Sequence, residues 1–146
     1  MNLDRFGFIL ASSTLLALGT LHFAGVTGNM TESELLGLYV KVPGPPARGR
    51  MVQLRGLIKH VAAVPGDTIR TSREGTYVNG KLWPHSAIPS NTYGYRPFPF
   101  TEFILGPGQY WVLGQSTDSW DSRYLGPVTG QDIAFNITPL WTHTNH

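Results

Sequence analysis

Glycine and proline divide this chain into short segments, and that division limits the possible folds more than any other feature of the sequence. The 146 residues include 17 glycines and 11 prolines, and only 14% of the residues are charged. Frequent turn formers with few charges favour many short strands over long surface helices. No amphipathic helix pattern is evident, so we expect one mainly β domain, an antiparallel β-sandwich or barrel, with at most one appendage.

Apolar segments bounded by turn residues mark the expected strands. They lie at residues 37–42, 57–67 (a strand that ends in a tight turn), 76–83, 108–114 and 133–137. Asn79-Gly80 stands between strand-like flanks and is the strongest short signal for a β-hairpin. Residues 84–99 are rich in Pro, Ser, Asn, Tyr and Gly, and we expect a long surface loop there.

The amino-terminal segment is the expected appendage. From Phe6 to Val26 the chain carries no formal charge and is largely apolar. About 20 such residues can span a bilayer as a helix, and Arg5 favours an amino terminus in the cytoplasm. The alternative is a cleavable secretory peptide, and either reading exports the rest of the chain. We expect residues 1–28 to be a membrane anchor or signal segment, with the anchor favoured, and residues 29–146 to be an exported β-rich domain.

Charge and composition exclude several classes of function. The net charge is only +2 and there is no run of Lys or Arg, so we expect no nucleic-acid partner. The absence of cysteine excludes disulfides, thiol catalysis and zinc–cysteine sites. His143 and His146 lie in a polar tail with no carboxylate beside them, and we therefore expect no metal and no cofactor.

Lys59 is the residue that points most directly to chemistry. Side chains alternate along a strand, so Leu57, Lys59 and Val61 share the face that should point to the core. A lysine is almost never fully buried without a reason, and burial lowers its pKa from about 10.4. A neutral lysine near pH 7 is a general base. The alternative is an amine that reaches solvent from a strand edge. His60 should point to the opposite face, and we assign it no role.

Three patches together resemble the signal peptidase I (leader peptidase) superfamily, most closely its TraF-type conjugative-transfer branch. The first is the run 29–39, which ends in Gly-Leu-Tyr. The second is Lys-His-Val-Ala-Ala-Val-Pro-Gly-Asp at 59–67, and the third is Ser-Trp-Asp-Ser-Arg-Tyr-Leu-Gly at 119–126. Their order and spacing agree with the family from about residue 6 to about residue 128, and the resemblance implies a β domain of the signal peptidase type.

The resemblance implies that Ser33 is the nucleophile and Lys59 the general base. A serine hydroxyl is a poor nucleophile until a base removes its proton, and a Ser–Lys dyad is a known arrangement. The hydroxyl of Thr31 matches the position that forms the oxyanion hole with the backbone N–H of Ser33, a donor that can contribute about 3–4 kcal/mol. From the residues alone, Ser33 could equally cap a short helix with Glu34 to Leu36 in its first turn.

The third patch is expected to support the lysine. Ser119 matches the residue whose hydroxyl orients the lysine amine. Asp121 and Arg123 match an ion pair that braces the loop, although in the TraF branch the aspartate has also been considered a third catalytic member. Taken without the resemblance, Asp121 and Arg123 could be a surface pair worth less than about 1 kcal/mol.

Two departures from the leader peptidase pattern lie beside the expected nucleophile. Leu35 stands in place of the usual proline, and Glu34 stands in place of the methionine of ordinary leader peptidases. The stretch 114–119 also lacks the acidic and basic residues of the bacterial leader peptidases. These differences favour the conjugation branch over the housekeeping enzyme.

The resemblance implies a membrane-anchored serine peptidase at the bacterial inner membrane, with its catalytic domain on the periplasmic side. It would process a conjugative pilin through an acyl-enzyme, and an attacking amine in place of water would cyclise the product. The expected partners are a pre-pilin or another exported protein, the inner membrane, and a type IV secretion or conjugation apparatus. Two alternatives stay open: a general signal peptidase I that only hydrolyses, and a non-catalytic, membrane-tethered β-domain that scaffolds a secretion complex.

Overall fold

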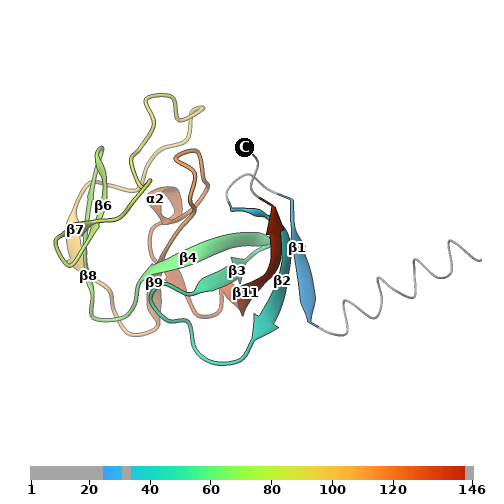
Figure 1. Ribbon diagram of the computed structural model, residues 1–146. Helices are drawn as coiled ribbons and strands as arrows, with labels where there is room; N and C mark the ends of the chain where they lie inside the picture. Colours follow the sequence, from blue (N-terminus) through green and yellow to red (C-terminus); the bar gives the residue numbers. More distant parts are fainter. Residues whose placement is uncertain (1–24, 31–33, 144–146) are drawn as a thin grey trace, which may run out of the picture.

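The computed structural model describes residues 25–30 and 34–143, and this part of the chain is mainly β. The strands are β1 (Val26–Asn29), β2 (Leu36–Val42), β3 (Met51–Leu54), β4 (Leu57–Ala63), β5 (Thr68–Ser72), β6 (Gly75–Val78), β7 (Lys81–Leu82), β8 (Glu102–Ile104), β9 (Gln109–Leu113), β10 (Val128–Thr129) and β11 (Ile133–His143). One short helix, α2 (Ser122–Leu125), follows β9 (Figure 1).

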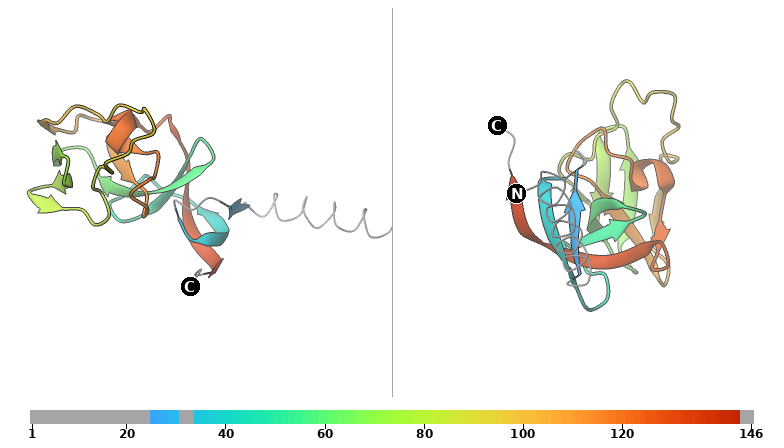
Figure 2. Two further views of the ribbon diagram at one scale, coloured as in Figure 1. Left: turned by 90° about the horizontal axis from the view of Figure 1, so that it is seen from above. Right: turned by 90° about the vertical axis from the view of Figure 1, so that its right-hand side faces the viewer.

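The strands form two antiparallel sheets. The larger has seven strands in the order β1-β2-β11-β3-β4-β9-β10, and the smaller has four in the order β7-β6-β5-β8. The small sheet lies at the end of the molecule away from β1 and β2, as the views in Figure 1 and Figure 2 agree in showing. The mainly β, antiparallel architecture expected from the sequence is thus confirmed.

The core is built on the two faces of the large sheet. On one face of β9, the fully buried Trp111 and Leu113 pack with Ile69 of β5 and Val78 of β6, and this cluster joins the two sheets. Val112 points to the opposite face and belongs to a second buried cluster with residues of β3, β4 and β10. β9 therefore connects both halves of the core. Full burial of an aliphatic side chain such as Leu113 or Val112 contributes about 1.5–3 kcal/mol to the stability of the fold.

Several expected elements are present. The expected strands at 37–42, 57–67 and 108–114 correspond to β2, β4 and β9, and the turn expected at the end of 57–67 follows Ala63. Asn79 and Gly80 join β6 to β7 with backbone φ angles of 49° and 80°, the left-handed pair that a two-residue hairpin of type I′ needs. Residues 84–99 contain no strand or helix, as expected of a long loop.

Two elements differ from the expectation. β11 runs to His143 instead of ending near residue 137, so residues 141–143 belong to the sheet and are not a polar tail. The strand passes Pro139 because its pairing with β2 shifts register between Pro139 and Trp141, and a proline is tolerated at such an irregularity. Helix α2 was not foreseen, since one turn is too short to show a periodic pattern.

The amino-terminal expectation falls mostly on residues that the structure does not describe. β1 begins at Val26, so the last residues of the expected appendage pair with β2. The rest of the membrane segment expected at residues 1–28 falls on positions 1–24, which are outside the described residues. Among residues 25–30 and 34–143, none of the helices has the length and apolar character needed to cross a bilayer.

Asp67 fixes the turn that leads from β4 into the small sheet. Its Oδ2 accepts the backbone N–H of Val64 at 2.8 Å, and its Oδ1 accepts the side-chain amide of Asn79 at 2.9 Å. The guanidinium of Arg48 also pairs with Oδ1. Burial acts to raise the pKa of Asp67, but these bonds outweigh it and the pKa lies below its ordinary value of 3.8.

We expect Asp67→Ala to lower the free energy of unfolding by about 2–3 kcal/mol at pH 7, because several bonds to one buried carboxylate are lost together. Because the folded pKa is lowered, this stabilisation is present above pH 4 and is lost as pH falls through the folded pKa. Urea denaturation at pH 7 and at pH 2 checks both statements. The matched control is Asp118→Ala at an exposed position; equal losses in the two variants would contradict the assignment.

Candidate active site

The side chain of Lys59 is completely buried. It lies on β4 opposite Val52 of β3, with no exposed surface. Its Nζ donates a hydrogen bond to Oγ of Ser119 at 2.8 Å, and Ser119 is itself buried. The alternative of an amine that reaches solvent from a strand edge is therefore wrong.

The surroundings of Lys59 favour an uncharged amine. Burial lowers the pKa of Lys59 below its ordinary value of 10.5, because a charged ammonium loses its hydration there. The negative charges of Asp121 and Glu34 act to raise the pKa, and the positive charge of Arg123 lowers it further. The net direction is downward, which is the property a lysine needs to accept a proton near neutral pH.

Asp121 and Arg123 form a buried ion pair that shapes the loop before α2. Nε of Arg123 donates to Oδ1 of Asp121 at 2.9 Å and its Nη2 donates to Oδ2 at 2.7 Å. The side chains are exposed by only 1% and 0%, so the reading as a surface pair is wrong. The remaining N–H groups of Arg123 donate to backbone carbonyls of His85, Ala87, Ser116, Thr117 and Ser119.

The carboxylate of Asp121 is occupied by this brace. Besides Arg123, it accepts the backbone N–H of Gly114 at 2.8 Å, and it caps the first turn of α2. Within the described residues, no hydrogen bond or ion pair joins Asp121 to Lys59. Asp121 therefore acts on the lysine through its charge and by holding the loop that carries Ser119.

Thr31 and Ser33 lie outside the described residues, but described side chains nearby bind the backbone of residues 34 and 35, which lead into β2. The side-chain amide of Asn29 donates to the carbonyls of Glu34 at 3.0 Å and Leu35 at 3.1 Å. The hydroxyl of Tyr39 donates to the carbonyl of Leu35 at 2.6 Å. The alternative of a helix with Glu34 to Leu36 in its first turn is wrong, because Leu36 already begins β2.

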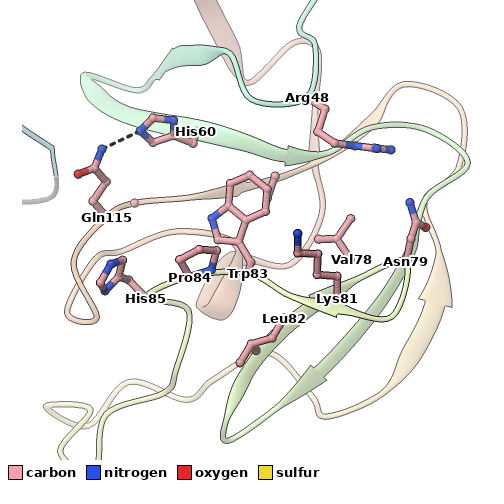
Figure 3. Close-up of a pocket in the computed structure, with 12 residues that line it drawn as sticks. Arg48, His60, Val78, Asn79, Lys81, Leu82, Trp83, Pro84, His85 and Gln115 are labelled. Atoms are coloured by element: carbon pink, nitrogen blue, oxygen red, sulfur yellow. Dashed lines mark hydrogen bonds between the residues drawn. The ribbon is translucent and has the colours of Figure 1, made fainter.

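Glu34 and His60 are brought together at this site, and sequence reasoning missed the pair. The carboxylate of Glu34 is fully buried, and its Oε1 lies 3.0 Å from Nε2 of His60. The same imidazole nitrogen lies 3.2 Å from the side-chain nitrogen of Gln115 (Figure 3). His60 does point away from Lys59, but the turn before β2 meets that opposite face. An acidic residue in place of an apolar one beside the expected nucleophile was the signal that could have indicated the pair.

A pocket of about 810 Å³ opens beside this pair, between β4 and the hairpin of β6 and β7 (Figure 3). His60 and Gln115 line one side, and Trp83 and Leu82 provide apolar surface on the other. Among the described residues, no three His, Asp or Glu side chains gather closely enough to hold a metal ion. The site therefore offers a buried amine with a lowered pKa and its serine partner, and a largely apolar pocket lies beside His60 on the same strand.

The model of the signal peptidase family, peptidase S26, matches residues 5–141. The chain belongs to the signal peptidase S26 family. Family membership supports a serine peptidase.

Named members of this signal peptidase family include proteins of plasmid transfer. The chain is 30% identical to the plasmid transfer protein TraF of Escherichia coli, covering 96% of each chain. It is 31% identical to a probable conjugal transfer protein TraF of Sinorhizobium fredii, covering 85% of this chain and 82% of the other. A probable signal peptidase I-2 of Synechocystis is 37% identical, over 52% of this chain and 34% of that protein. A solved signal peptidase I of Enterococcus faecalis superposes with a TM-score of 0.45 at 20% identity, over 66% of this chain and all of the other.

In this family member, we expect Arg123→Met to lower the free energy of unfolding by about 3–5 kcal/mol, because it leaves the carboxylate of Asp121 buried without its partner. Urea denaturation at pH 7 gives the difference. The matched control is Arg55→Met, because Arg55 pairs with Asp132 at an exposed position and its loss should cost less than about 1 kcal/mol. A small effect at Arg123 would contradict the role of the brace.

Proposed function

We propose that this protein is a membrane-anchored serine peptidase that uses Ser33 and Lys59 as a dyad to process, and to cyclise, a conjugative pilin. The observation that carries the proposal is the fully buried amine of Lys59, which donates to Ser119 at 2.8 Å and has a lowered pKa. Burial of a lysine lowers the stability of the fold because the ammonium loses its hydration. A lysine that acts as a general base needs such burial, because burial lowers its pKa.

The proposed reaction begins with attack of the Ser33 hydroxyl oxygen on a peptide carbonyl carbon. The Nζ of Lys59 takes the hydroxyl proton as the bond forms, and the hydroxyl of Thr31 with the N–H of Ser33 stabilises the oxyanion. The ammonium of Lys59 then returns the proton to the leaving amine, and an acyl-enzyme remains. Lys59 is neutral again and can deprotonate the next nucleophile.

Ser119, Asp121 and Arg123 act as positioning residues in this proposal. Ser119 fixes the direction of the Lys59 amine, and the pair of Asp121 with Arg123 fixes the loop that carries Ser119. The oxygens of Asp121 are engaged by Arg123 and Gly114, which favours a bracing role over a third catalytic one. Lys59 is buried and hydrogen-bonded to Ser119, which favours a catalytic role over a non-catalytic scaffold protein.

The identity of the second nucleophile separates two versions of the function. The similarity to TraF proteins along most of the chain supports a role in conjugation. In the version of the function that we propose for that role, an amine resolves the acyl-enzyme and gives a cyclic pilin. The partial similarity to a probable signal peptidase I-2 supports hydrolysis by water. We place the domain on the periplasmic side of the inner membrane, because the apolar segment 6–26 precedes it and Arg5 stands on its cytoplasmic flank.

We expect Ser33→Ala and Lys59→Ala each to abolish processing of a co-expressed pre-pilin, because the nucleophile or its base is removed. Residual rates should fall by at least about 10³-fold, in the range known for such dyads. Immunoblots of pre-pilin and mature pilin give the rates, and circular dichroism checks the fold. Lys41→Ala, at a half-buried lysine of β2, is the matched control. Full activity in either dyad variant would refute the mechanism.

The mass of the product distinguishes cyclisation from hydrolysis. We expect purified protein and pre-pilin to yield a product one water lighter than the linear mature chain, because an amine of the substrate displaces Ser33. Intact-mass spectrometry, followed by a single protease cut that linearises the ring, makes the assignment. A linear product alone would remove the cyclase proposal and leave the peptidase.

A further inference from the structure

Glu34 is a buried carboxylate with a single ionic partner among the described residues. It has no exposed side-chain surface, and its Oε1 lies 3.0 Å from Nε2 of His60. Within the described part of the chain, no hydrogen bond reaches either of its carboxylate oxygens, so the contact with His60 is ionic. A buried carboxylate without compensation is strongly unfavourable, so the imidazole of His60 is the group that makes this position tolerable.

This pair stands beside the proposed general base. His60 follows Lys59 on β4, and Glu34 belongs to the turn between β1 and β2 that meets the same strand. The negative charge of Glu34 acts on Lys59 in the direction that raises its pKa, against the effect of burial. An uncompensated charge at Glu34 would therefore hold the amine in its protonated, inactive form.

The charges around Lys59 fall into two pairs. From the loop before α2, Asp121 faces the amine and is compensated by Arg123 through two hydrogen bonds. From the segment that leads into β2, Glu34 acts on the amine through its charge, and its Oε1 lies 3.0 Å from Nε2 of His60, which offsets that charge when the imidazole is protonated. Two neutral polar groups among the described residues also lie at this pair: Gln115 lies against His60, and the phenol of Tyr39, whose pKa is raised by burial and by Glu34, donates to a backbone carbonyl.

We propose that His60 is a positioning residue of the active site, which holds the carboxylate of Glu34 and offsets its charge so that the amine of Lys59 stays a base. The inference rests on the proposed role of Lys59 and adds to it a second charged pair. The pair consists of the residue beside the expected nucleophile and the residue beside the base, so it also ties these two segments together. Gln115, at 3.2 Å from the same imidazole nitrogen, limits how the ring can turn.

The test is a direct titration of the amine, which needs no substrate. The chain has three lysines, so full-length protein labelled with ¹⁵N and ¹³C lysine in detergent micelles gives few signals. Lys59→Arg identifies the signal of Lys59. We expect His60→Gln to raise the pKa of Lys59 by roughly one pH unit, and Glu34→Gln to lower it by a similar amount. Where the amine is mostly protonated, a rise of one unit reduces the fraction of active base about tenfold.

The double variant decides between this device and a general effect of mutation. In the Glu34→Gln background, His60→Gln should no longer raise the pKa of Lys59, because the charge that His60 offsets is gone. His85→Gln is the matched control, since His85 lines the same pocket but has no described contact with Glu34; it should leave the titration unchanged. If His60→Gln fails to fold, His60→Asn takes its place, and Glu34→Gln tests the sign by itself.

The outcomes separate this inference from the proposed function. The role of His60 would be overturned if the pKa of Lys59 were unchanged in both His60→Gln and Glu34→Gln. It would also be overturned if His60→Gln shifted that pKa by the same amount in the wild-type and in the Glu34→Gln background. Neither result affects the dyad, which stands or falls on processing by Ser33→Ala and Lys59→Ala. An active Lys59→Ala variant would remove the dyad, and the titration would still report whether the pair controls the amine.

Discussion

The arrangement of this site depends on the burial of the Lys59 amine away from solvent. Lys59 has no exposed surface, and its single described hydrogen bond goes to Ser119 at 2.8 Å. That bond is available only because the loop of Ser119 is held by Arg123, whose guanidinium is fully engaged by Asp121 and by backbone carbonyls. A buried ion pair contributes little net stability by itself; here it fixes the loop whose Ser119 binds the buried amine of Lys59.

The large sheet brings the parts of the site together from distant segments. β4 carries Lys59, the turn before β2 carries Glu34, and the loop after β9 carries Ser119. The small sheet is joined to this assembly by apolar packing around Trp111 and by the polar turn at Asp67. The pocket lies where the two sheets approach each other, at the side of β4 that presents His60.

The sequence predicts those features that depend on neighbours in the chain. Alternation within residues 57–63 correctly places Lys59 toward the core, and Asn79-Gly80 correctly predicts the hairpin, because both signals are local. The partnership of Glu34 with His60 depends on a turn that meets the far face of β4 from 26 positions away, and no periodicity reports such a contact. The full length of β11 was missed for a related reason, since its second half is held by pairing with β2 in spite of Pro139.

The order of strands in the large sheet has a consequence for the timing of assembly. β11 lies between β2 and β3 in the large sheet and is hydrogen-bonded to both. β2 follows the segment with Glu34, and β3 pairs with the strand that carries Lys59. β11 follows every other described strand in the chain. A nascent polypeptide therefore completes the hydrogen-bonded connection between these two parts of the large sheet only once β11 has been synthesised.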